Sequence, residues 1–212
     1  LRSNQPELRV EFDAVAGRTN EPVPISVSTA IGSVTNSSRL EFDSNVHGLA
    51  TGMTLELVPE MKILQHEMLK LTLPLFTSSA FVFETSGFIG RWDNVTDQFL
   101  LVANKTFQPG QKVTVFLPER VRLPDVGVRL NAPTVTLEID AVDGRIFPTP
   151  VTRTASIGSI TNSSTLNFDP PKVSVDCNIT FTFVPEMALE RGDIISLRLP
   201  HFSRSAGGET YN

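Results

Sequence analysis

Short stretches of alternating apolar and polar residues recur along the whole chain. Residues 179–183 (ITFTF) alternate strictly, which predicts a strand with one buried face. Residues 113–117 and 135–139 are rich in β-branched and aromatic side chains, and shorter alternations occupy residues 40–42 and 166–168. Proline, glycine and aspartate cluster between these stretches, as they do in turns. The pattern therefore predicts an all-β protein built from many short strands.

The sequence repeats itself at an offset of 126 or 127 residues. IGSVTNSSRLEFD, which begins at Ile31, returns as IGSITNSSTLNFD at Ile157. VEFDAVAGR, which begins at Val10, returns as LEIDAVDGR at Leu137, so one residue is deleted between these two phrases. Two further phrases return in the same order, LVPEM as FVPEM and LTLPLFTSSA as LRLPHFSRSA. Such internal repetition indicates tandem structural modules.

The repeat suggests where the modules begin and end. The first residues, LRSNQP, match VRLNAP at residues 128–133. We therefore expect residues 1–127 to form a complete β-sandwich repeat, and residues 128–212 to form a second copy that lacks its last strands. The fold class expected is thus all-β, with two tandem immunoglobulin-like sandwiches, the second incomplete. The expectation concerns architecture alone, because the Cys…Trp…Cys signature of antibody domains is absent.

An incomplete sandwich exposes an apolar face and an unpaired sheet edge, and both favour association. Four apolar residues of the second copy would line this face: Phe181, Phe183, Leu197 and Leu199. We expect them to form an assembly surface, covered either by another copy of the chain or by continuation of the same chain. The partner expected is therefore a further copy of this protein, arranged head to tail.

Composition and charge narrow the class of protein. With 40% hydrophobic residues the 212-residue chain can build a sizeable core, and its net charge of −5 comes without a basic stripe. Nucleic acid is therefore not expected as a partner, and no membrane span is expected in this segment. The single cysteine, Cys177, excludes an intrachain disulfide. Because Cys177 shares the parity of Ile179 and Phe181, we expect it to be a buried thiol.

Asn-X-Ser/Thr triplets occur at five positions, where chance would give roughly 2. The five asparagines are Asn36, Asn94, Asn104, Asn162 and Asn178. Asn36 and Asn162 occupy equivalent places in the two copies, and Asn178 lies on the polar parity of its strand. The alternative is that Asn-Ser-Ser is simply a favourable turn. We expect N-glycosylation, and with it an extracellular or cell-surface location reached through the eukaryotic secretory pathway.

Motifs for catalysis or cofactor binding are not found in the sequence. The three histidines are scattered, and no HExxH, GxSxG, P-loop or GxGxxG motif occurs. Asp140 and Asp143 could hold calcium between modules, but a solvated Asp-Gly turn is the favoured interpretation. We expect no catalytic residues, no metal site and no cofactor apart from N-linked glycans.

Three other residues have two interpretations each. Glu60 and Glu186, in the repeated VPEM phrase, could act as acids, but a turn-capping role is favoured because neither has a second carboxylate nearby in sequence. Trp92 could stack on a sugar, although a lone tryptophan more often packs in a core. None of the three changes the expectation that the protein is not an enzyme.

The phrases FVPEM, RGDIISLRLPHF and PGQKVTVFLP resemble repeats of large secreted glycoproteins of algae and other protists. The resemblance covers both copies and implies tandem immunoglobulin-like sandwiches that build extracellular fibrils, cell coats or flagellar hairs. No catalytic or ligand-binding residue follows from it. The hypothesis is therefore a structural subunit of an extracellular glycoprotein filament or coat. An adhesion or receptor ectodomain that binds a protein or carbohydrate is the alternative, and an accessory module of a secreted enzyme is the third possibility.

Overall fold

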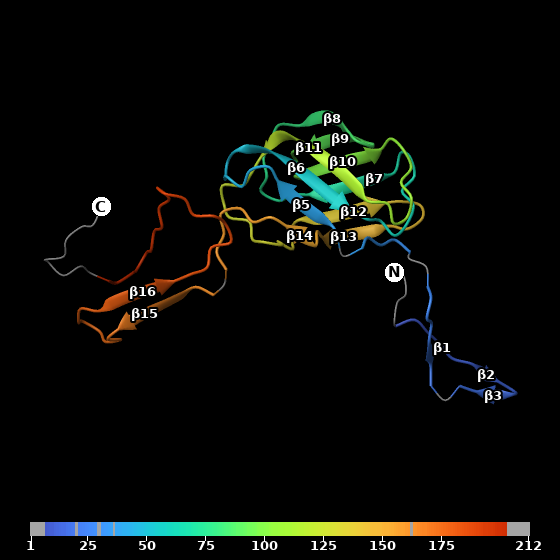
Figure 1. Ribbon diagram of the computed structural model, residues 1–212, viewed down its shortest axis with the longest axis horizontal. Coiled ribbons are helices and arrows are strands. Elements are labelled where there is room, and N and C mark those ends of the chain that lie inside the picture. Colours follow the sequence, from blue (N-terminus) through green and yellow to red (C-terminus); the bar gives the residue numbers. More distant parts are fainter. Residues whose placement is uncertain (1–6, 20, 29–30, 36, 162, 203–212) are drawn as a thin grey trace. The chain divides into compact units, whose positions relative to one another are not determined.

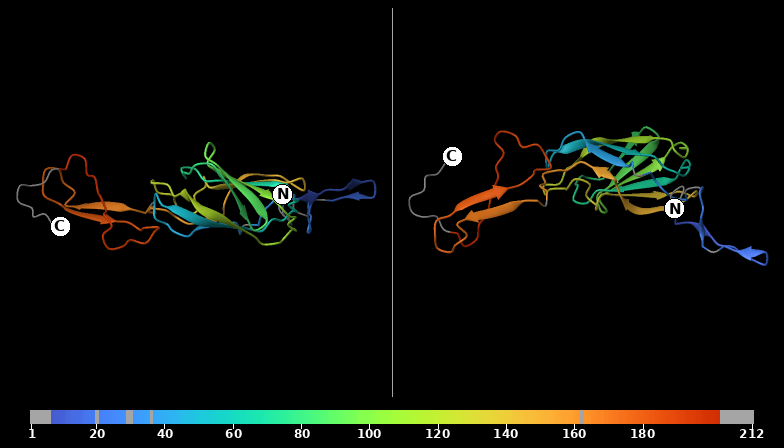
Figure 2. Two further views of the ribbon diagram at one scale, coloured as in Figure 1. Left: turned by 90° about the horizontal axis from the view of Figure 1, so that it is seen from above. Right: turned by 60° about the horizontal axis from the view of Figure 1, so that its bottom comes forward.

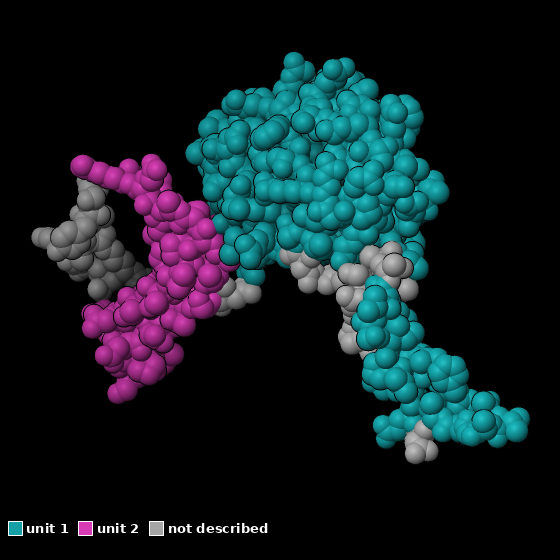
Figure 3. Space-filling view, turned by 45° about the vertical axis from the view of Figure 1, so that its right-hand side comes forward, with its two compact units in different colours: residues 1–158 teal, residues 159–212 magenta. Residues whose placement is uncertain are grey.

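The computed structural model describes residues 7–19, 21–28, 31–35, 37–161 and 163–202. All the elements of regular secondary structure in this part of the chain are β-strands, which confirms the predicted all-β class (Figure 1). The chain divides into a compact unit of residues 1–158 and a second unit of residues 159–212 (Figure 3). The two units are described separately below.

The first unit contains an immunoglobulin-like β-sandwich of two sheets. One sheet has the order β11-β6-β5-β14, and the other has the order β13-β12-β7-β10-β9-β8. Neighbouring strands are antiparallel except β14 and β5, which are parallel. The strands of the first sheet are β5 (Arg39–Phe42), β6 (Ala50–Leu57), β11 (Val113–Arg122) and β14 (Arg153–Thr154). Those of the second are β7 (Met68–Thr72), β8 (Phe81–Thr85), β9 (Phe88–Asp93), β10 (Gln98–Ala103), β12 (Thr136–Asp140) and β13 (Ile146–Pro150).

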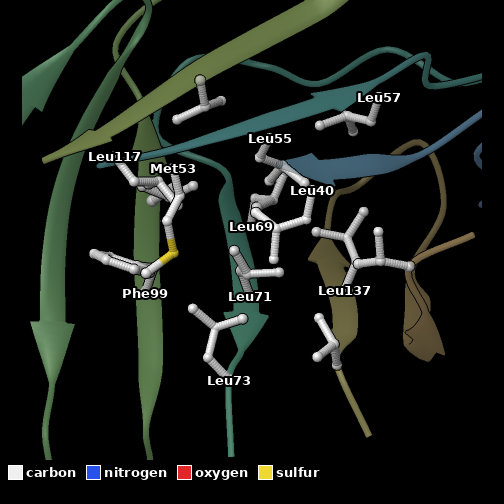
Figure 4. Packing of buried hydrophobic residues seen from close by; sticks show 14 of the residues in the cluster. Leu40, Met53, Leu55, Leu57, Leu69, Leu71, Leu73, Phe99, Leu117 and Leu137 are labelled. Carbon is white, nitrogen blue, oxygen red and sulfur yellow. The ribbon is translucent and has the colours of Figure 1, made fainter. Parts of the chain in front are cut away.

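Alternation along the strands creates the core between the two sheets. In β7 and β10 every second residue is buried, as expected for strands with one apolar face. Leu55 on β6 and Leu71 on β7 face each other across the sandwich and are fully buried (Figure 4). Trp92 packs edge-on against Phe99 at a centroid distance of 4.8 Å and is also fully buried. This position confirms the core interpretation of Trp92 and leaves its face unavailable to a sugar.

The sandwich takes its last strands from the second sequence copy. β12 lies beside β7, with Leu137 opposite Leu71 and Ile139 opposite Leu69, and these apolar side chains are buried. β14 then pairs with β5, and Val128 and Ile157 exchange two backbone hydrogen bonds of 2.7 and 2.8 Å. The sandwich therefore extends to Gly158, whereas the module boundary expected from the sequence lay between residues 127 and 128. The boundary differs because β7 and β5 would have unpaired edges without β12 and β14.

Shorter ribbons lie on either side of the sandwich in the sequence. Before it, β1 (Arg9–Val10) pairs with β4 (Val23–Pro24), and β2 (Asp13–Ala14) pairs with β3 (Gly17–Arg18). After it, in the second unit, β15 (Thr165–Asp169) pairs with β16 (Asn178–Thr182) (Figure 2). The β1–β4 pair and the β15–β16 pair correspond, at the repeat offsets of 127 and 126 residues, to strand pairs of the sandwich.

Candidate functional site

The glutamate of each VPEM phrase is hydrogen-bonded to the serine of the preceding IGS phrase. The Glu60 N–H donates to the Ser33 carbonyl at 3.0 Å, and the Ser33 hydroxyl donates to the Glu60 carboxylate. In the second copy Glu186 and Ser159 form the same two hydrogen bonds, with the backbone bond at 2.9 Å. Both carboxylates are thus acceptors for a neighbouring loop, which agrees with the turn-capping interpretation. The serine of the IGS phrase and the glutamate of the VPEM phrase are repeated as an interacting pair.

The second unit has the strand register of the first two strands of the sandwich. β5 and β6 place Leu40 opposite Leu55, and β15 and β16 place Leu166 opposite Phe181, 126 residues later. The same shift relates two ring pairs, Phe42 with Phe76 at 5.7 Å and Phe168 with Phe202 at 5.2 Å. Local sequence therefore specifies the same ribbon in both copies.

Burial is what distinguishes the two copies. The counterparts of the four expected assembly residues in the sandwich are all fully buried: Leu55, Leu57, Leu71 and Leu73. In the second unit Phe181 and Phe183 stack on one another at 5.0 Å and are half-buried. Leu199 is half-buried and Leu197 is 44% exposed, and both lie in the part of the described chain that forms no strand. The structure thus brings the two phenylalanines together and leaves the two leucines in a segment without a sheet partner among the described residues.

The N-terminal ribbon, which comprises β1 to β4 and their connections, repeats the register of β12 and β13. β1 and β4 place Arg9 opposite Pro24, as β12 and β13 place Thr136 opposite Pro150. The backbone hydrogen bond from Ile25 N to Leu8 O, 2.8 Å, corresponds to the bond from Val151 N to Val135 O, 3.0 Å. The ion pair between Arg18 and Glu11 corresponds to the pair between Arg145 and Glu138, and both measure 2.9 Å.

This N-terminal ribbon exposes residues whose counterparts are in the core. Phe12 is 60% exposed, whereas its counterpart Ile139 is fully buried. Ile25 is likewise exposed, and its counterpart Val151 is buried. These N-terminal residues were missed as assembly candidates in the sequence. The signal was present in the match between VEFDAVAGR and LEIDAVDGR, but it requires knowing that the second phrase completes a sandwich.

Electrostatics at β12 stabilise the strand that completes the sandwich. The Arg145 guanidinium, and to a lesser extent Lys70 at 3.3 Å, holds the pKa of the Glu138 carboxyl below its ordinary value, while partial burial opposes this shift. The hydrogen bond to Glu138, and to a lesser extent the charge of Asp140 on the same strand, raises the pKa of Arg145. Among the described residues no group of three acidic, histidine or cysteine side chains could hold a metal ion.

The sequons within the described residues lie on the surface. Asn94 is exposed in the turn between β9 and β10, Asn104 is exposed just after β10, and Asn178 is exposed at the start of β16. Asn36 and Asn162 lie outside the described residues. Cys177 is half-buried, so the expectation of a buried thiol is wrong. Ile179, which has the same parity as Cys177, is exposed on the strand that follows it.

No helix in the described part of the chain is long and apolar enough to cross a membrane.

Comparison with known proteins identified one solved structure with a similar fold and gave no information on function. No family model matches the chain, and no curated protein matches it. Among solved structures, the chain is similar to an uncharacterized protein from Nocardia farcinica whose crystal structure reveals an immunoglobulin-like fold. The two are 21% identical with a TM-score of 0.39, and the match covers 52% of this chain and 81% of the other. Function therefore has to be argued from this protein's own residues.

Proposed function

We propose that this chain is a non-enzymatic structural subunit of an extracellular glycoprotein filament or cell-surface coat, in which β-sandwich modules follow one another head to tail. One observation carries the proposal. The segments before and after the sandwich have the strand registers of its last and first strands, yet they expose apolar residues that the sandwich buries. Exposed surfaces of this kind favour association with a complementary surface.

Linear arrangement is supported by the way each module is built. Because β12 to β14 belong to the second sequence copy and lie in the first sandwich, the chain enters a new repeat before it has left the old module. The second unit begins at Ser159, directly after the sandwich ends at Gly158, so consecutive modules follow one another along the chain without a linker segment. Modules that contact only their neighbours in this way form quasi-one-dimensional arrays.

The surface suits an extracellular role. Three sequon asparagines are exposed on turns or at a strand start, where a glycan would extend into solvent: Asn94, Asn104 and Asn178. Their accessibility supports modification by N-linked glycans in the secretory pathway. The resemblance of the repeated phrases to fibril- and coat-forming glycoproteins of algae and other protists points in the same direction.

Assembly of the chain secreted from a eukaryotic cell tests the proposal. Sedimentation at rising protein concentration is expected to show progressive association, and negative-stain microscopy is expected to show linear particles. Phe12→Ser is expected to weaken the association, and Phe116→Ser is the matched control, because Phe116 is equally exposed, at 60%, on the outer surface of β11. A monodisperse monomer at every concentration would contradict the filament. If such a monomer bound a protein or carbohydrate, it would favour the adhesion alternative.

A further inference from the structure

We propose that residues 7–28 of one copy dock on residues 159–202 of a second copy and take the places that β12, β13 and β14 occupy on the sandwich. The inference rests on the proposed function, because it specifies the interface through which the subunits associate. Each predicted contact is obtained from a strand pair observed in the sandwich by replacing both residues with their counterparts in the other sequence copy, 126 or 127 positions away. We call this replacement translation. Four features of the described residues support this translation, and one opposes it.

The first contact lies along the counterpart of β7. In the sandwich, Leu137 and Ile139 of β12 lie opposite Leu71 and Leu69 of β7. Translation places Val10 opposite Leu197 and Phe12 opposite Ile195, so both pairs remain apolar. Ile195, Leu197 and Phe12 are each exposed in the single chain. Strand addition at this edge would pair backbone groups and remove all three side chains from water.

The second contact lies along β15, the counterpart of β5. In the sandwich, Thr152 N donates to Ser38 Oγ at 2.9 Å, and the two hydroxyl groups lie 3.0 Å apart. The counterparts are Ser26 and Ser164, which keep a hydroxyl group at both positions. β14 also places Arg153 opposite Arg39, whereas the docked copy would place Val27 opposite Thr165 and would avoid that like-charged pair.

The third contact is a hydrogen bond at the turn between the two docked strands. In the sandwich, the Glu67 carboxylate accepts from Leu64 N and from Val142 N, each at 2.6 Å. In the second unit the Asp193 carboxylate accepts from Glu190 N at 2.8 Å, as Glu67 does from Leu64. The counterpart of Val142 is Val15, so the docked turn would donate the Val15 N–H to Asp193. The same local cap is thus built in both copies, and docking would supply its second donor.

The fourth contact is a close approach of two glycines. A Cβ on Gly144 would lie 2.2 Å from Gly32 N, so the turn of β12 and β13 requires glycine at this contact. The counterparts of Gly144 and Gly32 are Gly17 and Gly158. A Cβ on Gly17 would meet nothing within 4 Å in the single chain. The backbone φ of 148° at Gly17 favours glycine in the single chain, but no contact there adds to that preference, and docking against Gly158 would add the steric requirement that Gly144 has in the sandwich.

One pair opposes docking. Thr136 lies opposite Thr72 in the sandwich, and translation places Arg9 opposite Arg198, where like charges repel. Glu11 is a diagonal neighbour of Arg198 in this register and offsets part of the repulsion. The docked segment also leaves open the edges on which β10 and β11 lie in the sandwich. We therefore expect a concentration-dependent contact that is weaker than the sandwich itself.

The arginine pair provides a test in which a substitution should strengthen the contact. Arg9→Glu or Arg198→Glu alone converts repulsion into an ion pair and is expected to tighten association about two- to five-fold in sedimentation. The double variant Arg9→Glu with Arg198→Glu restores like charges and is expected to lose the gain. Both arginines are exposed, so neither change affects the sandwich core. Additive gains in the double variant, or no gain in either single variant, would overturn the register.

Cross-linking tests the same register directly. Two single-cysteine chains are made in a Cys177→Ser background, one with Glu11→Cys and one with Ser196→Cys, because Glu11 falls opposite Ser196 and opposed positions lie within disulfide reach. Mild oxidation of the mixture is expected to give mainly the mixed dimer, identified by mass spectrometry of the linked peptides. Lys172→Cys, at an exposed position of the same unit, is the control partner and should give no such preference.

The outcomes separate this inference from the proposed function. A random mixture of the three possible dimers overturns the docking, and so does a chain with both Glu11→Cys and Ser196→Cys that closes on itself as a monomer. If linear particles still form in either case, the filament proposal stands and only its interface is different. If neither association nor selective cross-linking is observed, both proposals fail.

Discussion

Leu71 and Leu197 occupy the same position of the repeat, but only Leu71 is fully buried. Leu71 lies on β7 between β12 and β10, in the middle of the six-stranded sheet. Leu71→Ala removes three carbon atoms from a closed core, where the lost burial and the residual cavity together cost about 3–4 kcal/mol of the free energy of unfolding. Leu197→Ala removes the same atoms from a side chain that is 44% exposed and outside any closed core, and the expected change is within about 0.5 kcal/mol.

Urea unfolding followed by fluorescence measures this difference. Trp92 is the single tryptophan and is fully buried in the sandwich, so its emission reports on that module alone. With a slope of about 2 kcal/mol per molar urea, Leu71→Ala is expected to lower the midpoint by roughly 1.5–2 M. Leu197→Ala should leave the midpoint of dilute, unassociated protein within about 0.3 M of the wild type.

Ile139→Val extends the comparison to the strand supplied by the second sequence copy. Because Ile139 is fully buried on β12, its loss of one methyl group is expected to cost about 1 kcal/mol. An unchanged midpoint for Ile139→Val would refute the assignment of β12 to the first sandwich. Equal midpoint shifts for Leu71→Ala and Leu197→Ala would refute the argument that burial, and not the repeat position, decides the energetic role.

Three further predictions follow from single features. Glu138→Gln is expected to lower the free energy of unfolding by about 0.5–1 kcal/mol at neutral pH. Because the folded-state pKa of Glu138 is lowered, the stabilisation by its carboxylate is present above the unfolded-state pKa and is lost as pH falls through the folded-state pKa, so urea titrations should show the difference between wild type and variant closing over that range. In Gly127→Ala the new Cβ would lie 2.1 Å from the Gly158 carbonyl oxygen, so the thermal midpoint should fall further than in Gly110→Ala, whose positive φ is strained but whose surroundings are open. Mass spectrometry of protein secreted from a eukaryotic cell should find glycans on the exposed sequon residues Asn94, Asn104 and Asn178. Unmodified asparagine at all three would remove the case for the secretory pathway.

Individual strands could be predicted from the sequence because strand propensity and side-chain alternation are local properties. Residues 179–183 alternate strictly in sequence, and β16 forms there as predicted, although Ile179 is exposed and only Phe181 and Phe183 are half-buried. The repeat offsets also predicted equivalent structure correctly, since β5–β6 and β15–β16 have the same register. The glutamates of the VPEM phrase behave alike in both copies for the same reason.

The expected partition at residues 127 and 128 was a different kind of inference, because repeat phase carries no information on where a module starts. A periodic sequence can be divided at any point, and each division predicts the same strands. Only the pairing of Leu137 with Leu71, and of β14 with β5, places the end of the sandwich at Gly158. The N-terminal candidates Phe12 and Ile25 were missed as a consequence.

The sequence by itself determined the strand class, the repeat and the local hydrogen bonds that recur in both copies, because these depend on residues close together along the chain or on direct identity. Tertiary structure alone decided which copies of an apolar residue are buried. Ile139 and Phe12 have the same place in the pattern, yet Ile139 has β7 beside it and Phe12 has no strand at the place of β7 among the described residues. Burial requires a partner from elsewhere in the chain, or from another molecule, and hydrophobic free energy is gained only where that partner is present.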